Sequence, residues 1–362
     1  MWPYFIPVIF IVFMQFHFTG MPKVKSKAYI ASLLLLLFAG IRGNGDGDYF
    51  AYLNAGQAIN TIYDIFNNSI PMDTGYPVLA YFVNQFHLPA QTIIILMNAI
   101  SIGCMAVTIR RYSCIPILSV LVFLPFFYQF DMQAARTAVS IGIFMLSIPY
   151  VIERKPLKFS LVLAMSVLFH PSALIGIFLY FLPKLKLNYK IMTIILIAEA
   201  AWVTLIGVDR LAMAILRTVR LEKVYQRFSA YVNDTTYGYA ANVFDVRILL
   251  VILLFIVASG VITKPSDLER LMINAAFACA FIMIFFSEHT VFVYRLSAFY
   301  NVFTILLVPT VLSHIGKTST HKYRYLRVHI IVVLFYAAFA FAYAYRIGKN
   351  AEYKVFELMY WH

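Results

Sequence analysis

Long apolar stretches follow one another along the chain, and short polar or basic segments separate them. A helix needs about 20 mainly apolar residues to cross the hydrocarbon core of a bilayer. Stretches without a charged residue include 31–41, 92–108, 248–263 and 328–345. The pattern predicts an all-α, polytopic integral membrane protein with about eleven transmembrane helices.

The apolar stretches and the polar segments between them predict the ordinary membrane passes. We expect a single polytopic membrane domain over residues 1–362, with outer loops at about 42–90 and 208–245. The predicted passes cover residues 3–19, 27–41, 91–109, 114–130, 133–152, 189–207, 246–263, 269–286, 296–315 and 326–346.

One apolar segment, 159–182, has basic residues at both ends although it has room for only one ordinary pass. His170-Pro171 lies at its middle, and a proline disfavours helix at the residue before it. We therefore predict a broken hairpin of two short helices, about 158–169 and 172–183, which turns at His170. The alternative is a single kinked helix that crosses the membrane.

The composition agrees with a membrane protein, because 62% of the residues are hydrophobic and only 12% are charged. Soluble domains have roughly 45–50% apolar residues. The cysteines Cys104, Cys114 and Cys279 lie in or beside apolar runs, so neither a disulfide framework nor a zinc-binding spacing is visible. We expect no cofactor and no bound metal.

The net charge of +13 comes from basic clusters between the apolar runs, not from one basic surface that would bind nucleic acid. Basic loops stay in the cytoplasm, so the two chain ends and the two long loops are predicted to face outside. The clusters are Lys23/Lys25/Lys27, Arg110/Arg111, Arg154/Lys155/Lys158, Lys184/Lys186/Lys190, Lys264/Arg270 and Lys317/Lys322/Arg324/Arg327.

Three arginines interrupt the apolar pattern near predicted outer ends of helices: Arg42, Arg136 and Arg295. An arginine within a membrane helix costs up to ~3 kcal/mol, and its planar fork binds phosphate or carboxylate. These residues are candidates for binding an anionic group. The structural alternatives are an ion pair of Arg136 with Asp131 and one of Arg295 with Glu288.

Two further residues could take part in catalysis. His170, at the predicted break, can take or give a proton near neutral pH, although it could equally be a structural histidine. Asp48 follows Arg42 in a glycine-rich turn, where it could cap the next helix or, with Asp46, form part of a metal or sugar-donor site. The chain has no phosphate-binding glycine loop and no Ser-His-Asp or His-Glu-x-x-His motif.

Several patches between about residues 40 and 300 together resemble the EpsG-type (Wzy-like) polysaccharide polymerases. The most specific is Phe169-His170-Pro171-Ser172-Ala173, which is similar to the family's Phe-His-x-Ser-Ala. Gly75-Tyr76-Pro77 stands where the family often has Glu-Pro-Leu-Phe. The other patches are Arg42 followed by Asp48-Tyr49, Gln133-Ala134-Ala135-Arg136, and Tyr294-Arg295.

The resemblance implies an enzyme of O-antigen, capsule or exopolysaccharide biosynthesis in the bacterial cytoplasmic (inner) membrane. Such a glycosyltransferase moves a glycan chain from undecaprenyl pyrophosphate onto a lipid-linked repeat unit, on the periplasmic or outer side. Its partners would be polyprenyl-pyrophosphate-linked oligosaccharide, membrane lipid, a chain-length regulator and a flippase. The implied roles are catalysis for His170 and Asp48, pyrophosphate binding for Arg42, Arg136 and Arg295, and glycan binding for Tyr49, Tyr76, Gln133 and Tyr294.

Two other functions stay open at this point. A GT-C-type glycosyltransferase with a polyprenyl-phosphate sugar donor would depend on Asp46 and Asp48, and a GT-C-like membrane architecture stays an open alternative for the fold. A lipid-linked oligosaccharide flippase or other transporter would be expected to show internal symmetry, and the sequence shows no internal repeat.

Overall fold

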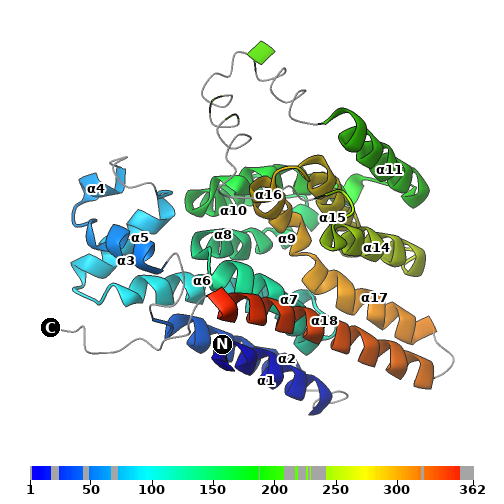
Figure 1. Ribbon diagram of the computed structural model, residues 1–362, viewed down its shortest axis with the longest axis horizontal. Coiled ribbons are helices and arrows are strands. Elements are labelled where there is room, and N and C mark those ends of the chain that lie inside the picture. The colour runs from blue at the N-terminus through cyan, green and yellow to red at the C-terminus, as the bar shows by residue number, and fades with distance from the viewer. Residues whose placement is uncertain are drawn as a thin grey trace. The chain divides into compact units, whose positions relative to one another are not determined.

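In the computed structural model, the secondary-structure elements of the described residues are all helices (Figure 1). Four of these helices are long and apolar enough to cross a membrane, or up to five if a bent pair counts as one, and shorter apolar helices accompany them. The predicted class, an all-α multi-pass membrane protein, is confirmed; the count of about eleven passes stays a prediction. The structure describes residues 2–17, 24–43, 49–66, 72–186, 188–207, 217–218, 226, 229, 242–318 and 322–350.

The chain divides into two compact units. Unit 1 contains residues 1–177 and 304–362, and unit 2 contains residues 178–303. The predicted single domain over residues 1–362 stays a prediction. Of the predicted outer loop at 208–245, the structure describes only positions 217, 218, 226, 229 and 242–245.

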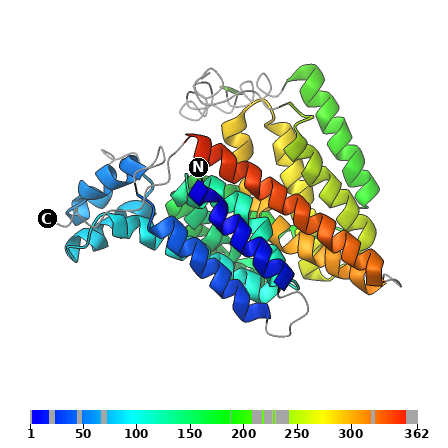
Figure 2. The ribbon, with the colours of Figure 1, turned by 60° about the horizontal axis from the view of Figure 1, so that its bottom comes forward.

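The centre of unit 1 is α7 (Pro116–Phe126), in which every residue is buried. A helix that is apolar on all sides needs neighbours on all sides, and Pro116 suits its first turn because the missing N–H would have no helical partner there. Figure 2 shows the blue α1 and α2 beside the red α18. The helices that pack against α7 include α1 (Ile6–His17), α2 (Val24–Gly40), α17 (Thr304–Thr318) and α18 (Lys322–Asn350).

A π-helical turn, η2 (Phe127–Asp131), continues α7 at its end. Pro125 lies within α7, and a proline in a helix removes one hydrogen bond and clashes with the preceding turn. The widened turn is closed by a hydrogen bond of 3.0 Å from the N–H of Met132 to the carbonyl oxygen of Phe127. Turns of this kind are frequent at functional sites, and this one ends directly before the helix that carries Arg136.

That helix, α8 (Ala135–Met145), packs against α6 (Gln91–Tyr112) and α10 (Pro156–Phe169). The hydroxyls of Ser140 and Ser166 each donate to the other residue's carbonyl oxygen, at 2.8 Å. Such reciprocal bonds bring the two backbones together at one level of the membrane.

The next segment, η3 (Pro171–Tyr180), is a 3₁₀ helix, and its residues up to 177 belong to unit 1, as α8 does. A Cβ built on Gly176 would lie 2.9 Å from Cζ of Phe144. Phe144 lies one turn after Ser140 on α8, on the side away from the start of that helix. Gly176, which contacts Phe144, therefore lies on the same side of the Ser140–Ser166 pair, so the chain has reversed its direction at His170. A single kinked helix would carry Gly176 about 15 Å beyond Ser166 in the other direction. The break at His170 is confirmed, and these contacts favour the hairpin.

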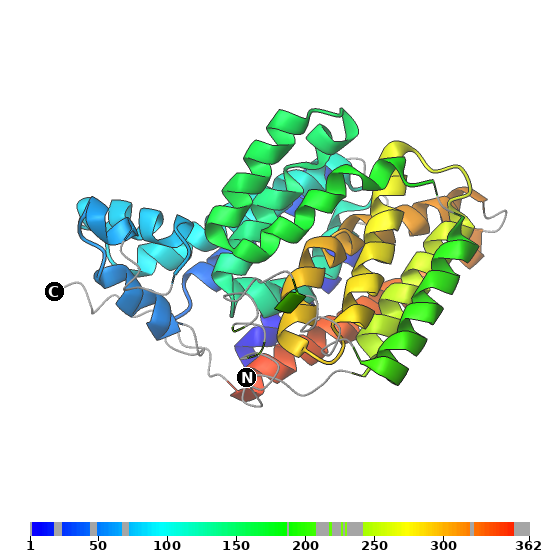
Figure 3. The same ribbon diagram turned by 90° about the horizontal axis from the view of Figure 1, so that it is seen from above.

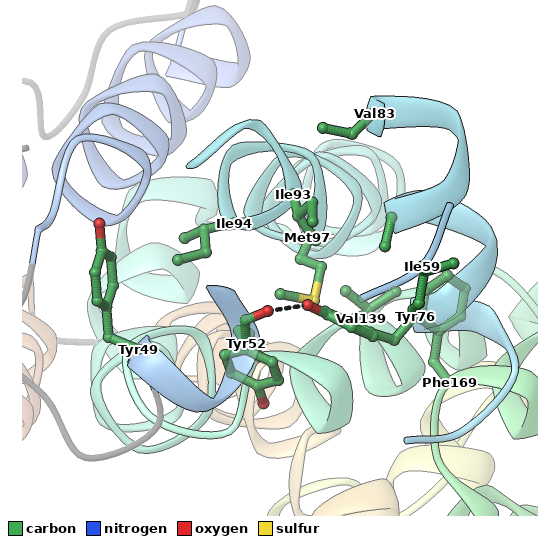
Figure 4. Close-up of a cluster of buried hydrophobic side chains, with 12 residues drawn as sticks. Tyr49, Tyr52, Ile59, Tyr76, Val83, Ile93, Ile94, Met97, Val139 and Phe169 are labelled. Carbon is green, nitrogen blue, oxygen red and sulfur yellow. Dashed lines mark hydrogen bonds between the residues drawn. The ribbon is translucent and has the colours of Figure 1, made fainter. Parts of the chain in front are cut away.

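Short helices between α2 and α6 cover the end of this helix group. A cluster of buried side chains joins them to α6, α8 and α10 (Figure 4). The glycines in them permit close approach: a Cβ on Gly75 would lie 2.9 Å from the Phe169 ring and 3.0 Å from the carbonyl oxygen of Leu168. These helices are α3 (Tyr49–Gln57), α4 (Ile62–Phe66) and α5 (Gly75–Gln85).

In unit 2, the helices α11, α14 and α15 lie side by side (Figure 3). Side-chain caps begin each of them: Asn188 accepts from the N–H of Lys190, Asp245 from that of Arg247, and Ser266 forms a capping box with Glu269. The described elements are η4 (Leu182–Lys184), α11 (Tyr189–Ile206), α14 (Val246–Val261), α15 (Asp267–Phe285) and α16 (Thr290–Asn301).

Candidate functional site

Arg136 stands in the first turn of α8, as predicted, and its partner is Asp73. Nη1 of Arg136 donates to Oδ2 of Asp73 at 2.6 Å, and the side chains are 23% and 30% exposed. The alternative from the sequence, an ion pair with Asp131, is wrong. Nε of Arg136 is buried and has no hydrogen-bond partner among the described residues, so the guanidinium keeps an unused donor.

The N-terminus of α8 adds to the positive character around Arg136. Ala134 occupies the cap position and forms no side-chain cap, so donors of the first turn lack the partner that a serine or aspartate would supply. Unsatisfied N–H groups at a helix start favour anions. Gln133, a predicted glycan contact, is exposed one residue before this cap.

Asp131 is almost fully buried, at 1% exposure, at the end of η2. Its carbonyl oxygen accepts a hydrogen bond of 3.0 Å from Nη1 of Arg42. Ser101 and the Arg42 charge lie close to its carboxyl group. Asp131 therefore ties the end of α2 to the turn that leads into α8.

Arg42 is itself only 2% exposed, whereas the sequence placed it at the outer surface. The side chain of Gln91 holds the adjoining backbone: its Nε2 donates to the carbonyl oxygens of Gly40 and Arg42 at 2.7 and 2.9 Å. Its Oε1 accepts from the Tyr49 hydroxyl at 2.8 Å. Gln91 thus joins the end of α2 to the start of α3, a role that the sequence analysis missed.

His170 is 7% exposed and lies at the tip of the hairpin in an extended conformation. The backbone N–H of Ser172 donates to its Nδ1 at 3.2 Å. A neutral imidazole whose Nδ1 accepts carries its proton on Nε2. In this arrangement Nε2 carries the proton of the ring, whereas a general base would need a nitrogen without one.

His170 and the Arg136–Asp73 pair belong to the same end of unit 1. Phe169 precedes His170 and its ring touches Gly75, which follows Asp73 by two residues. The reciprocal bonds between Ser140 and Ser166 place Arg136, one turn before Ser140, at this end also. Residues distant in sequence therefore converge around the start of α8.

The predicted glycan-binding tyrosines of unit 1 are buried in the cluster of Figure 4. Tyr76 is 0% exposed, and its hydroxyl donates to the carbonyl oxygen of Tyr52 (Figure 4). Tyr49 is 4% exposed and bonded to Gln91. Both rings pack among the buried side chains of this cluster, which come from α3, α5, α6, α8 and α10, and their role in glycan binding stays a prediction.

Tyr294 and Arg295 belong to unit 2, where Arg295 is exposed. The described residues show no ion pair between Arg295 and Glu288. The guanidinium of Arg247 lies over the Tyr294 ring, 4.6 Å from its centre. The same guanidinium binds Asp245 through Nε and Nη2, at 2.8 and 2.5 Å, and thereby holds the pKa of Asp245 below its usual range.

Some predicted site residues lie outside the described residues, among them Asp46 and Asp48. Within the described part of the chain, no group of three or more histidine, cysteine or acidic residues could hold a metal ion. Asp73 was visible in the sequence as one of several loop aspartates, but no pattern paired it with Arg136. The partner is 63 residues away, and only the fold brings the two together.

The apolar helices indicate a multi-pass membrane protein. In unit 1, arginines and a histidine lie near the start of α8 and the broken hairpin at His170. The chain belongs to the EpsG family, since the sequence model of that family matches residues 25–357. Membership makes it a polysaccharide-polymerase-like, glycosyltransferase-like membrane protein of polysaccharide biosynthesis. No curated protein and no solved structure matches the chain.

Proposed function

We propose that the protein is a polysaccharide polymerase of the Wzy type. It transfers a glycan chain from polyprenyl pyrophosphate onto the sugar of a lipid-linked repeat unit, at the outer face of the cytoplasmic membrane. The observation that carries the proposal is the guanidinium of Arg136, with its buried unused Nε, at the uncapped start of α8 beside the His170 hairpin.

The chemistry needs positive charge at the leaving group. An acceptor hydroxyl oxygen attacks the anomeric carbon, the bond from that carbon to the pyrophosphate oxygen breaks, and the pyrophosphate leaves with the electron pair. Arg136 is proposed to stabilise the charge that develops there through its fork. The N–H groups of the first turn of α8 lie at the same end of unit 1 as Arg136, and they add hydrogen-bond donors for the pyrophosphate oxygens.

His170 is proposed to act beside this group through Nε2–H. As a donor it can hydrogen-bond a pyrophosphate oxygen or orient a sugar hydroxyl, while the bond from Ser172 fixes the ring. The predicted role as general base requires the other tautomer and the loss of that bond. Asp48 stays the proposed alternative for the residue that receives the hydroxyl proton.

The remaining arginines enter the proposal in different ways. Arg42 is a positioning residue, because it holds the turn at Asp131 that leads into α8. Arg295 stays a proposed pyrophosphate-binding residue, and within unit 2 it is exposed next to Tyr294, whose ring Arg247 covers. Tyr49, Tyr76, Gln133 and Tyr294 are the proposed glycan contacts.

The test is polymerisation by purified protein supplied with a polyprenyl-pyrophosphate-linked repeat unit. Product length is read on a gel, and released polyprenyl pyrophosphate is quantified by mass spectrometry. Arg136→Lys and Arg295→Lys keep the charge but lose the fork, and each is expected to lower turnover at least tenfold. Arg111→Lys is the matched control, because Arg111 is exposed at the far end of α6.

Release of one polyprenyl pyrophosphate for each repeat unit that joins the polymer would support the reaction. Full activity in both lysine variants would contradict pyrophosphate binding by these forks. A protein that moves the lipid-linked unit across vesicles without joining units would be a flippase instead. Loss of activity on metal removal together with Asp48→Asn would point to the GT-C-type reaction.

A further inference from the structure

Several large apolar side chains are exposed on the short helices α4 and α5, in a segment for which the sequence predicts an outer loop. Their exposed fractions range from 54% for Phe82 to 74% for Tyr63. A surface in water rarely exposes a large contiguous apolar area, so these side chains need a partner. We call them the apolar patch, which consists of Ile62, Tyr63, Phe66, Phe82 and Phe86.

Helix α5 is apolar on more than one side. Tyr76, Ala80 and Val83 are buried in the cluster of Figure 4, whereas Phe82 and Phe86 are exposed. The N–H of Phe86 donates to the carbonyl oxygen of Phe82 at 3.1 Å, so the two residues lie one helical turn apart on the same face. A helix that is apolar on several sides is covered on each of them by protein or by lipid.

Hydrogen bonds join the end of α5 to the start of α4. Nε2 of Gln85 donates to the carbonyl oxygen of Asn60 at 3.0 Å. Gln85 directly precedes Phe86, and Asn60 lies two residues before Ile62. The side chain of Asn84 adds two hydrogen bonds to the backbone between α3 and α4. The exposed side chains of α4 and α5 therefore form one patch.

The packing of the short helices on α6 sets the depth of this patch. Helix α6 has 22 residues, which extend about 33 Å, and the hydrocarbon core of a bilayer is about 30 Å thick. The two ends of α6 therefore lie near the two boundaries of the core. The cluster of Figure 4 packs α3 and α5 against Ile93, Ile94 and Met97, in the first two turns of α6. The apolar patch thus lies at the level of the outer boundary.

Exposed apolar side chains connect the patch with the lipid-facing side of the membrane helices. On α2 they recur at a helical spacing, and the last of them is Ile41. Its neighbour Gly40 packs against α6, where a Cβ built on Gly40 would lie 3.5 Å from Cγ1 of Ile95. Ile95 is exposed, as is Leu88, which joins Phe86 to α6. The surface that faces lipid on α2 therefore continues across α6 to the patch.

The charges of this segment favour an apolar contact over an electrostatic one. Residues 43–109 contain no lysine or arginine that would attract an anionic headgroup. Of the acidic residues that the structure describes here, Asp64 accepts hydrogen bonds from the N–H groups of Asn60 and Thr61. Asp73 is paired with Arg136. The patch therefore fits the uncharged boundary between headgroups and acyl chains.

We propose that the apolar patch inserts into the outer leaflet at this boundary and anchors the short helices in the membrane. Tyrosine and phenylalanine rings suit such a depth, where one side meets acyl chains and the other meets headgroups. The neighbouring polar residues, Asn60 and Thr61, stay among the headgroups in contact with water. One consequence rests on the proposed function: the anchor would hold Arg136 at the depth of a lipid pyrophosphate.

The test places one tryptophan in the patch of the full-length protein, after the native tryptophans are replaced by phenylalanine. Phe86→Trp reports on α5, and Phe66→Trp reports on α4. Each protein is reconstituted in phosphatidylcholine vesicles whose acyl chains carry bromine, a quencher of tryptophan emission, either near the headgroup or near the chain end. We expect the shallow bromine to quench both reporters about twofold more than the deep one. The native tryptophans are Trp2, Trp202 and Trp361.

Two control positions calibrate the depth. Leu33→Trp, on the exposed side of α2 near its middle, should be quenched more by the deep bromine, and Glu153→Trp, in an exposed loop, should be quenched least. Thermal melts against the tryptophan-free protein check folding, and Phe66→Trp keeps the test valid if Phe86→Trp does not fold. The measurement needs no turnover, so its outcome is independent of the proposed function.

Three results would overturn the proposal. Red-shifted emission without quenching in both reporters would place the patch in water. Blue-shifted emission without quenching would show that protein covers it, such as a second copy of the chain. Stronger quenching by the deep bromine, as expected for Leu33→Trp, would place the patch inside the hydrocarbon core.

Discussion

The side chains of Arg136 and Asp73 form an ion pair with 2.6 Å between Nη1 and Oδ2, although 63 residues separate them in the sequence. The pair links the loop before α5 to the first turn of α8. A carboxylate on an arginine fork has the charge and geometry of a bound anion. Asp73 thus occupies the position at which the proposal places the substrate's pyrophosphate.

Replacing Asp73 by Asn should strengthen binding of polyprenyl pyrophosphate, because the guanidinium of Arg136 would no longer be neutralised. A partly exposed ion pair is worth about 0.2–1 kcal/mol, so we expect an affinity gain of up to about fivefold. The measurement is a binding titration of purified protein with the lipid pyrophosphate. Weaker binding in Asp73→Asn would show that Asp73 positions Arg136 and does not compete with the substrate.

Replacing His170 distinguishes donation from proton abstraction. If Nε2–H donates to the substrate, His170→Gln should keep a measurable part of the turnover, because the amide also donates, and His170→Ala should lose about 10²-fold or more. The assay is polymerisation in vitro, with a thermal melt of each variant. A His170→Gln protein that folds normally but is as inactive as His170→Ala would restore the base role.

Replacing Gly176 by Ala should destabilise the hairpin, because a Cβ would collide with the ring of Phe144, which is 0% exposed and cannot easily move. Overpacking of this kind costs about 1–3 kcal/mol. A lower melting temperature in detergent checks this. Gly103→Ala is the matched control, since nothing lies within 4 Å of a Cβ there; alanine in that helix should leave the melting temperature equal or higher.

A second variant makes the same prediction more specific. In a protein with Phe144→Leu, the smaller side chain leaves room for the methyl group, so adding Gly176→Ala should cost less than it does beside phenylalanine. Equal losses in the two backgrounds would mean that Gly176 does not pack against Phe144, and the hairpin at His170 would have to be abandoned.

Cysteine labelling tests the predicted orientation. In a protein without its native cysteines, a cysteine at Asn60 should react with a membrane-impermeant thiol reagent added to whole cells, and one at Lys155 should react only after the membrane is opened. Both positions are exposed, and the positive-inside rule puts Lys155 in the cytoplasm. Reversed labelling would move Arg136 and His170 to the cytoplasmic side.

The chain's own pattern was sufficient for the class of protein and for the local break at His170. Apolar stretches of membrane length leave helices as the way to satisfy the backbone, and Pro171 prevents the helix from continuing through His170. Both effects depend on residues close together in sequence. The arginine at the start of α8 was recognisable for the same reason.

Only the tertiary structure decided which groups meet. The partner of Arg136 proved to be Asp73 and not the nearby Asp131, because the short helices before α6 fold over the end of α8. Tyr76 is buried by the same packing, whereas Phe82 and Phe86 of the same segment stay exposed. Ion pairs and surface patches form between segments whose sequence separation carries no signal, so they depend on side-chain packing in three dimensions.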